Sequence, residues 1–378
     1  MIDAEVFLNW LTSGGIRRFV GVPDSLLKSL LSTVDGSKDV ETHVVAANEG
    51  AAVGYAIGVY LESGFPAAVY MQNSGLGNAI NPLTALAHRD VYGTPMILII
   101  GWRGEPGKHD EPQHMVQGKI TPKLLEVMGI PYVVLESDED AASKQVESLV
   151  LQMSADPQPV AILVRAGTFS SRRLSDTPEE TLPLSREASL GLIAPRIPLG
   201  SRVIATTGML GRELWELRKR TNTSTEGDFM VVGGMGHASA IAHGVAEANP
   251  TQTVWCLDGD GSMLMHLGSV AVIGHHKPSN LKHVLFNNFA HDSVGGQPTA
   301  ASTISMEQMA KSLGYSWLGS GSNSNEVSSL VENLSNSDGP ALIEVRIRRG
   351  ARSDLGRPPS TLFAPGTRFP RPESSISS

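Results

Sequence analysis

The chain has 378 residues, of which 41% are hydrophobic and 18% charged, and its formal net charge is −8. This length has room for two domains of ordinary size, and the negative charge argues against a general nucleic-acid binder. The single cysteine, Cys256, excludes a disulfide framework within one chain, which fits a reducing compartment. No apolar run approaches the ~20 residues of a membrane span, and no basic segment precedes one at the N-terminus, so we expect a cytoplasmic protein without a membrane partner.

Helical and strand patterns alternate through the first half of the chain. Apolar residues at helical spacing predict a helix over residues 4–13, which Gly14-Gly15 would end. Strand-like runs follow at residues 18–22, 43–46, 66–71, 95–100, 132–135 and 160–164, with helical patterns between most of them. This alternation predicts an α/β layer with a largely parallel sheet, which we assign to a first domain at residues 1–175.

The alternation is lost in a stretch rich in Ser, Arg, Pro, Glu and Thr, and we predict an interdomain linker at residues 176–198. It restarts near Ser201 and continues to a strand pattern at residues 342–345, which gives a second domain at residues 199–350. Residues 351–378 form a Pro-, Ser- and Arg-rich tail that we expect to be poorly ordered at its end. The predicted fold class is therefore α/β, with two domains that each contain a mainly parallel sheet flanked by helices.

Residues 254–288 form the most informative unit. An apolar run ends in Asp258-Gly259-Asp260-Gly261, a helical pattern starts at Ser262, and a second apolar run ends in Asn287-Asn288. A strand, helix and strand close as a right-handed crossover, so the acidic and amide groups should meet at one carboxyl edge of the sheet.

The residue types at this edge predict a metal and a diphosphate. Gly259 and Gly261 let the backbone approach a ligand closely, and Ser262 can cap a helix whose N-terminus attracts an anion. Asp260 and an Asn amide oxygen suit magnesium, which usually keeps diphosphate oxygens in its coordination shell. The alternative is an ordinary Gly-rich turn from a strand to a helix, with an Asn-rich turn downstream.

GDG followed, after the 25 residues 262–286, by NN resembles the cofactor signature of thiamine diphosphate enzymes. The resemblance implies a pyrimidine-binding domain and a diphosphate-binding domain, with thiamine diphosphate and magnesium held between them. In this family the site commonly spans a subunit interface, so we expect a homodimer or a higher homo-oligomer.

Glu49, in AANEGAAVG, matches by position the glutamate that binds the cofactor's aminopyrimidine and favours its imino tautomer. The alternative is a glutamate that complements the helix dipole beside an Asn48 cap. The resemblance also implies metal ligands at Asp260, Asn288 and the Ala290 carbonyl, with Asn287 as a rival for the second position. The cofactor-contacting residues that it implies are Asn73, Gly75, Gly208, Gly234, Met235, Gly259, Asp260, Gly261, Ser262 and Asn288.

Four further stretches, GVPDSLLK, GWRGEPGKHDEPQHMVQG, FNNFAHDSVGGQPT and RSDLGRP, resemble the branch of this family that comprises phosphonopyruvate and sulfopyruvate decarboxylases. The chain has no room for the third, central domain of other members. One departure is Phe289-Ala290, where relatives often have Gly-Ala, and it bears on the backbone geometry of the metal loop.

The resemblance implies that the small-molecule substrate is the 2-oxo acid 3-phosphonopyruvate, which would lose carbon dioxide and be released as phosphonoacetaldehyde. Our candidates for proton handling are Asp24, His109 and His114, although Asp24 can also be a helix cap and the histidines solvated loop residues. The candidates for the phosphonate are Ser25, Lys28, Lys108, Ser293 and Gln297, with Arg103, Arg352 and Arg357 as further cations.

Three alternatives to this function can be weighed on sequence. Sulfopyruvate is the closest rival substrate, because sulfonate and phosphonate are similar tetrahedral anions. A nicotinamide-dependent oxidoreductase is a rival of another class, but GMGHAS breaks the GxGxxG pattern at its last glycine. A non-catalytic binding protein would have no need of Glu49.

Overall fold

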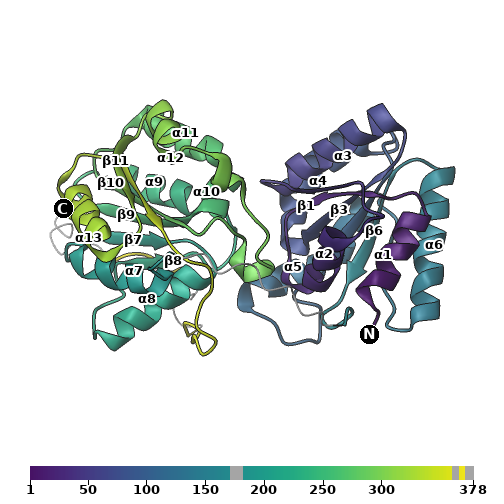
Figure 1. The fold of residues 1–378 in the computed structure, drawn as a ribbon, viewed down its shortest axis with the longest axis horizontal. Helices are drawn as coiled ribbons and strands as arrows, with labels where there is room; N and C mark the ends of the chain where they lie inside the picture. The colour runs from purple at the N-terminus through teal and green to yellow at the C-terminus, as the bar shows by residue number, and fades with distance from the viewer. Residues whose placement is uncertain (171–181, 360–365, 371–378) are drawn as a thin grey trace. The chain divides into compact units, whose positions relative to one another are not determined.

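The structure is a computed structural model that describes residues 1–170, 182–359 and 366–370. The chain divides into two compact units, Met1–Pro178 with Ser293–Gln297, and Glu179–Asp292 with Pro298–Ser378. Each unit contains a six-stranded sheet in which all paired strands are parallel. Helices cover both faces of each sheet (Figure 1), so the predicted α/β fold class is confirmed.

The first sheet has the strand order β2-β1-β3-β4-β6-β5. Its strands are β1 (Arg18–Gly21), β2 (Thr42–Val45), β3 (Ala67–Gln72), β4 (Met96–Gly101), β5 (Tyr132–Val134) and β6 (Pro159–Val164). Its helices are α1 (Ala4–Ser13), α2 (Lys28–Gly36), α3 (Glu49–Ser63), α4 (Leu76–Pro82), α5 (Pro112–Val127) and α6 (Glu139–Ala155).

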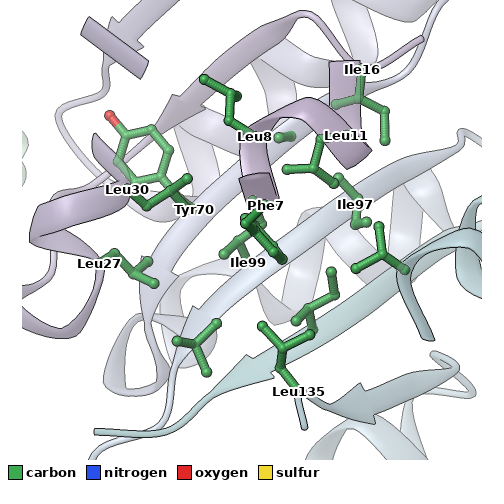
Figure 2. Close-up of a cluster of buried hydrophobic side chains, with 14 of the residues drawn as sticks. Phe7, Leu8, Leu11, Ile16, Leu27, Leu30, Tyr70, Ile97, Ile99 and Leu135 are labelled. Atoms are coloured by element: carbon green, nitrogen blue, oxygen red, sulfur yellow. The ribbon is translucent and has the colours of Figure 1, made fainter. Parts of the chain in front are cut away.

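Alternate residues of these strands enter two separate cores, because successive side chains of a strand point to opposite faces. One core lies under α1, α2 and α6. Figure 2 shows its centre, where Phe7 of α1 packs against Ile97 and Ile99 of β4. The other core lies under α3, α4 and α5 and takes Leu98 and Ile100 from the same strand. Burial on both faces explains why β4 reads as a continuous apolar run.

The second sheet has the strand order β11-β12-β10-β9-β7-β8. Its strands are β7 (Arg202–Ala205), β8 (Asp228–Met230), β9 (Val254–Gly259), β10 (Leu281–Asn287), β11 (Ser316–Gly321) and β12 (Ala341–Arg346). The helices α7 (Arg186–Ile193), α8 (Met209–Arg220) and α13 (Ser324–Asn336) pack on one face, and α9 (Ala238–Ala248), α10 (Asp260–Met265), α11 (Leu267–His276) and α12 (Met306–Ser312) pack on the other.

The helix predicted from Ser262 to about residue 274 is two helices. The backbone at His266 leaves the helical region, with φ −130° and ψ 49°, and separates α10 from α11. Cys256 is fully buried in the core beneath α9 and α11, as the apolar pattern of β9 indicates. Among the described residues, no helix is both long and apolar enough to cross a bilayer.

Part of the stretch predicted as a linker, residues 176–198, belongs to the second core. The Ser185 hydroxyl caps α7 by accepting a hydrogen bond from the Ala188 N–H, and Leu190 and Ile193 are buried. The predicted tail also has order near its start, because Leu355 is buried and the Arg212 guanidinium donates to the Gly356 carbonyl. Residues 171–181 and 371–378 lie outside the described residues.

The burial of α7 can be tested with a leucine of the predicted linker, Leu190, and one directly after it, Leu199. Leu190 is fully buried, whereas Leu199 is 97% exposed. We expect Leu190→Ala to lower the free energy of unfolding by about 2–4 kcal/mol, and Leu199→Ala to change it by less than about 0.5 kcal/mol. Urea denaturation of both variants measures this difference, and equal midpoints would show that α7 is not part of the core.

Candidate active site

Asp260 lies where β9 passes into α10, at the carboxyl edge of the second sheet. Its side chain is 3% exposed, and its carboxylate accepts hydrogen bonds from the Thr299 hydroxyl and from the backbone N–H groups of Gly261 and Asn288. Burial is the largest influence and raises the pKa of Asp260 to about 6, although these hydrogen bonds lower it. A divalent cation would favour the ionised form of this buried carboxylate.

The two asparagines at the carboxyl end of β10, Asn287 and Asn288, have different surroundings. Asn287 is fully buried in β10, where its amide donates to Glu344 Oε1 on β12 at 2.7 Å. Asn288 follows the strand, and its Oδ1 accepts a hydrogen bond from the Ala290 N–H at 3.1 Å. Asn287 Oδ1 likewise accepts a hydrogen bond from the Phe289 N–H at 3.1 Å. The two asparagines therefore differ in the partner of the amide N–H group, which holds Asn287 to the neighbouring strand.

The loop after Asn288 folds back on itself. The Thr299 N–H donates to the Phe289 carbonyl at 3.0 Å, and an isolated bridge pairs Ala290 with Pro298. The Thr299 hydroxyl then reaches Asp260, so the loop and the acidic turn are held together. Phe289 has φ 58°, a left-handed conformation that is costly for a residue with a Cβ. This explains physically why a glycine is suited to this position.

Ser262 does not cap α10, contrary to the expectation from sequence. Gly259 is the cap residue, and no side chain bonds to the cap N–H groups. The Ser262 hydroxyl instead lies 2.8 Å from the Thr206 hydroxyl and accepts a hydrogen bond from the Gly236 N–H at 3.2 Å. Ser262 therefore connects α10 to the loop that contains Met235, whose side chain is half-buried and belongs to neither core of this unit.

Glu49 is the first residue of α3 and is 5% exposed. Asn48 caps the helix by accepting from the Ala51 N–H, and Glu49 Oε2 accepts a hydrogen bond from the Asn78 amide at 2.7 Å. Glu49 Oε1 faces Gly75, where an added Cβ would lie only 2.3 Å from this oxygen. The segment Asn73–Asn78 therefore supplies both the donor that orients Glu49 and the glycine that leaves room for its carboxylate.

Asp24 follows β1 and is fully buried. Its Oδ2 accepts from the Leu26 N–H at 2.9 Å and caps a short helix, while its Oδ1 has no partner among the described residues. Burial is the main cause that raises the pKa of Asp24 to about 6, against the opposing effects of the Leu26 hydrogen bond and the charge of Arg103. Asp24 is therefore a helix cap and also a carboxyl group that titrates near neutral pH.

A charged network lies next to Asp24. The Arg103 guanidinium donates two hydrogen bonds to Asp110, at 2.8 and 2.5 Å, and one to the Ser25 hydroxyl at 3.0 Å. His114 Nδ1 lies 2.9 Å from Asp110 Oδ1. Burial alone would raise the pKa of Asp110, but the hydrogen bonds from Arg103, His114 and the backbone hold it well below its usual range. Asp110 thus fixes the orientation of both Arg103 and His114.

The remaining candidates are less closely grouped. The Asn73 amide donates to the Arg103 carbonyl and to Thr121, so its side chain supports the network within the protein. Gly208 is the cap residue of α8 and has φ 94°.

Arg352 pairs with the carboxylates of Glu187 and Glu216 on α7 and α8. Four candidates are exposed, namely Lys28, Lys108, His109 and Ser293, whereas Gln297 is buried.

Sequence reasoning missed the side chains that position the site. Asp110, Asn78, Thr206 and Thr299 were not candidates, although Asp110 and Thr299 lie inside stretches that carry the family resemblance. The spacing of His114 four residues after Asp110 is a weak signal of their ion pair. No pattern in the sequence indicates that Thr299 reaches Asp260 across a loop.

Comparisons with known proteins match one protein family to each of the two compact units. Residues 3–125 match the family described as thiamine pyrophosphate enzyme, N-terminal TPP binding domain, and residues 206–345 match the corresponding C-terminal TPP binding domain. The chain is 33% identical to a phosphonopyruvate decarboxylase of Streptomyces viridochromogenes, over 98% of this chain and 94% of that protein.

Two further relatives carry related names. A phosphonopyruvate decarboxylase of Streptomyces hygroscopicus is also 33% identical, over 95% of this chain and 90% of that protein. A sulfopyruvate decarboxylase of Methanosarcina acetivorans is 27% identical, over 79% of this chain and 78% of that protein. The similarity to each of the two Streptomyces proteins therefore extends over nearly the full length of this chain and of that relative.

The left-handed backbone at Phe289 gives a prediction about stability. Phe289→Gly and Phe289→Ala both remove the ring that packs against the core, but only alanine keeps a Cβ at φ 58°. We expect the glycine variant to be more stable than the alanine variant by about 1 kcal/mol, as measured by urea denaturation. Equal stabilities would contradict a backbone cost at this position.

Proposed function

This chain belongs to the thiamine diphosphate-dependent phosphonopyruvate decarboxylase family, and we propose on that basis that it converts 3-phosphonopyruvate to phosphonoacetaldehyde and carbon dioxide. The substrate assignment rests on one observation, the 33% identity over nearly the whole chain to two proteins that are named phosphonopyruvate decarboxylase. The two matched domains support thiamine diphosphate as the cofactor. The alternative of a nicotinamide-dependent oxidoreductase has no support from these matches.

The second unit has donors that fit magnesium and a diphosphate. We assign the metal to the Asp260 carboxylate, the Asn288 amide oxygen and the Ala290 carbonyl, a set of hard oxygen ligands. The buried carboxylate of Asp260, with its pKa raised to about 6, supports this assignment, because a cation would offset the cost of its charge. Gly234, Met235, Gly259, Gly261 and Ser262 are the proposed neighbours of the cofactor on this side.

The first unit has a carboxylate that fits the aminopyrimidine. The Asn78 amide donates to Glu49 Oε2, and the absence of a Cβ at Gly75 makes room for the carboxylate at Oε1. We assign the proton-sharing contact with a ring nitrogen to Oε1. Burial of Glu49 excludes water from this contact. When bound, the cofactor supplies an electron sink for the decarboxylation, and the chain's own residues supply orientation and protons.

Ser25 and Arg103 are the proposed site for the phosphonate. Their hydrogen bond places a hydroxyl and a guanidinium side by side, a pair that suits a tetrahedral oxyanion. Asp110 holds the guanidinium in place through two hydrogen bonds. The exposed Lys28 and Lys108 have no comparable support, and Ser293 and Gln297 remain candidates from the loop that follows Asn288.

Asp24 is the proposed proton donor to the carbon that loses carbon dioxide. It is next in sequence to Ser25, it is fully buried, and its pKa of about 6 allows it to carry a proton near neutral pH. Its Oδ1 is buried without a hydrogen-bond partner among the described residues, and we assign the contact with the substrate to this atom. His114 is a second candidate, whereas the exposed position of His109 favours a solvated residue.

We further propose that a complete site contains Glu49 of one subunit and Asp260 of another in a homodimer or larger homo-oligomer. Support comes from the family resemblance and from the separation of the two residues into different compact units. Magnesium, this oligomeric state and a cytoplasmic location are predictions.

Carbon dioxide release from phosphonopyruvate, sulfopyruvate and pyruvate, measured in parallel with and without thiamine diphosphate and magnesium, tests the proposed function. We expect release that requires both cofactors and that has its highest kcat/KM with phosphonopyruvate. A higher kcat/KM with sulfopyruvate would overturn the substrate and keep the chemistry. No release from any substrate by enzyme that binds the cofactor would overturn decarboxylation.

The role of Asp24 predicts a pH dependence. Only the protonated carboxyl group can donate, and this form is lost as the pH rises through about 6, so kcat should decrease above that pH. Asp24→Asn should lower kcat about 100-fold and remove this decrease. Ser25→Ala serves as the control, because it should raise KM while keeping the pH profile. An unchanged pH profile in Asp24→Asn would assign the proton to another group.

A further inference from the structure

We propose that His243, Glu247 and His276 form a zinc site on the surface of the second unit. His243 and Glu247 lie four residues apart on α9, and His276 is the last residue of α11. One ligand atom from each residue can be chosen so that all three lie within 4.8 Å of one another. Two imidazoles and a carboxylate are a ligand set typical of zinc sites that leave a position open to water.

The helices bring these side chains together for a structural reason. Residues at i and i+4 of a helix share a face, so His243 and Glu247 project from the same side of α9. α9 and α11 pack side by side over the same face of the second sheet, with Ala242, Ala246 and Ile273 buried in their common core (Figure 1). His276 is thereby brought beside His243, with ring centroids 5.0 Å apart.

The separation of the first two side chains suits a shared ion better than a direct contact. His243 Nε2 lies 3.5 Å from Glu247 Oε1, and Nε2 is buried without a hydrogen-bond partner among the described residues. Two ligands bound tetrahedrally at about 2.0–2.1 Å from zinc lie roughly 3.4 Å apart. An ion bound to both atoms would satisfy the buried nitrogen with little movement of either side chain.

The helix ends also favour a cation at this place. Glu247 is in the last turn of α9, and His276 ends α11. The C-terminal end of a helix carries a partial negative charge, so two such ends attract a positive ion. Imidazole ligands select zinc over magnesium, which prefers oxygen.

This site is separate from the proposed magnesium site. Asp260 starts α10 at the carboxyl edge of the second sheet, whereas His276 ends α11 shortly before β10 begins at the opposite edge. A bound zinc ion would link α9 to α11. Because α9 follows the loop of Met235 and α11 follows α10, this link would stabilise the face of the sheet whose loops hold the cofactor.

Calorimetric titration of zinc into tag-free protein tests the proposal. The protein is first loaded with thiamine diphosphate and excess magnesium, and free cofactor is then removed. We expect one zinc ion per chain, and affinity at least about tenfold weaker in both His276→Gln and Glu247→Gln. Zinc should also raise the Tm of the wild-type chain by about 2–4 °C and leave that of His276→Gln unchanged.

His275→Gln is the matched control. His275 is adjacent to His276, with ring centroids 5.8 Å apart, but it is not one of the three proposed ligands. This variant should bind zinc as tightly as the wild type. Equal affinity in the wild type and both ligand variants, or an equal loss in His275→Gln, would overturn the proposed site. Glu247 is exposed, so Glu247→Gln still tests the site if substitution of His276 impairs folding.

Discussion

The burial of carboxylates at the carboxyl ends of parallel strands is the constraint on which the proposed chemistry depends. Asp24 follows β1, Glu49 follows β2, and Asp260 follows β9, and each is at most 5% exposed. Burial raises the pKa of both Asp24 and Asp260 to about 6, so each can change protonation state or partner near neutral pH. A carboxylate on an exposed loop would be solvated and would keep a pKa near its usual value.

Neighbouring groups give these carboxylates different proposed roles. The Asn78 amide donates to Glu49, and Gly75 has no Cβ that would collide with its carboxylate. Thr299 and backbone N–H groups donate to Asp260, the proposed metal ligand. The Asp24 carboxylate accepts backbone hydrogen bonds from Leu26 and Ser25, and its Oδ1 has no side-chain or backbone partner among the described residues, which suits the proposed proton donor. The proposal therefore assigns tautomer control, metal binding and proton transfer to three carboxylate side chains with different neighbours.

Much of this arrangement was predictable because periodicity and motif spacing are local properties of the sequence. Alternating strands and helices predicted both parallel sheets, and GDG with NN predicted which strand ends meet. The sequence did not indicate the loop contact from Thr299 to Asp260, the pairing of Asn287 with Glu344, or the Asp110 network, because these contacts join side chains from separate elements. The helix α7 escaped prediction because its short apolar stripe lies within a polar, Pro-containing stretch. Ser262 was misassigned as a cap because a serine near a helix start has that role more often than the link to Thr206 and Gly236 seen here.

The central claim is that Glu49 and Asp260 act in one site formed by two subunits. It is tested most directly by mixing two inactive variants, Glu49→Gln and Asp260→Asn, under conditions that allow subunits to exchange. Random pairing in dimers would restore roughly a quarter of the wild-type rate of carbon dioxide release from phosphonopyruvate, because half of the sites in mixed dimers contain both native residues. A mixture no more active than either variant alone, despite demonstrated exchange of subunits, would contradict a site shared between subunits.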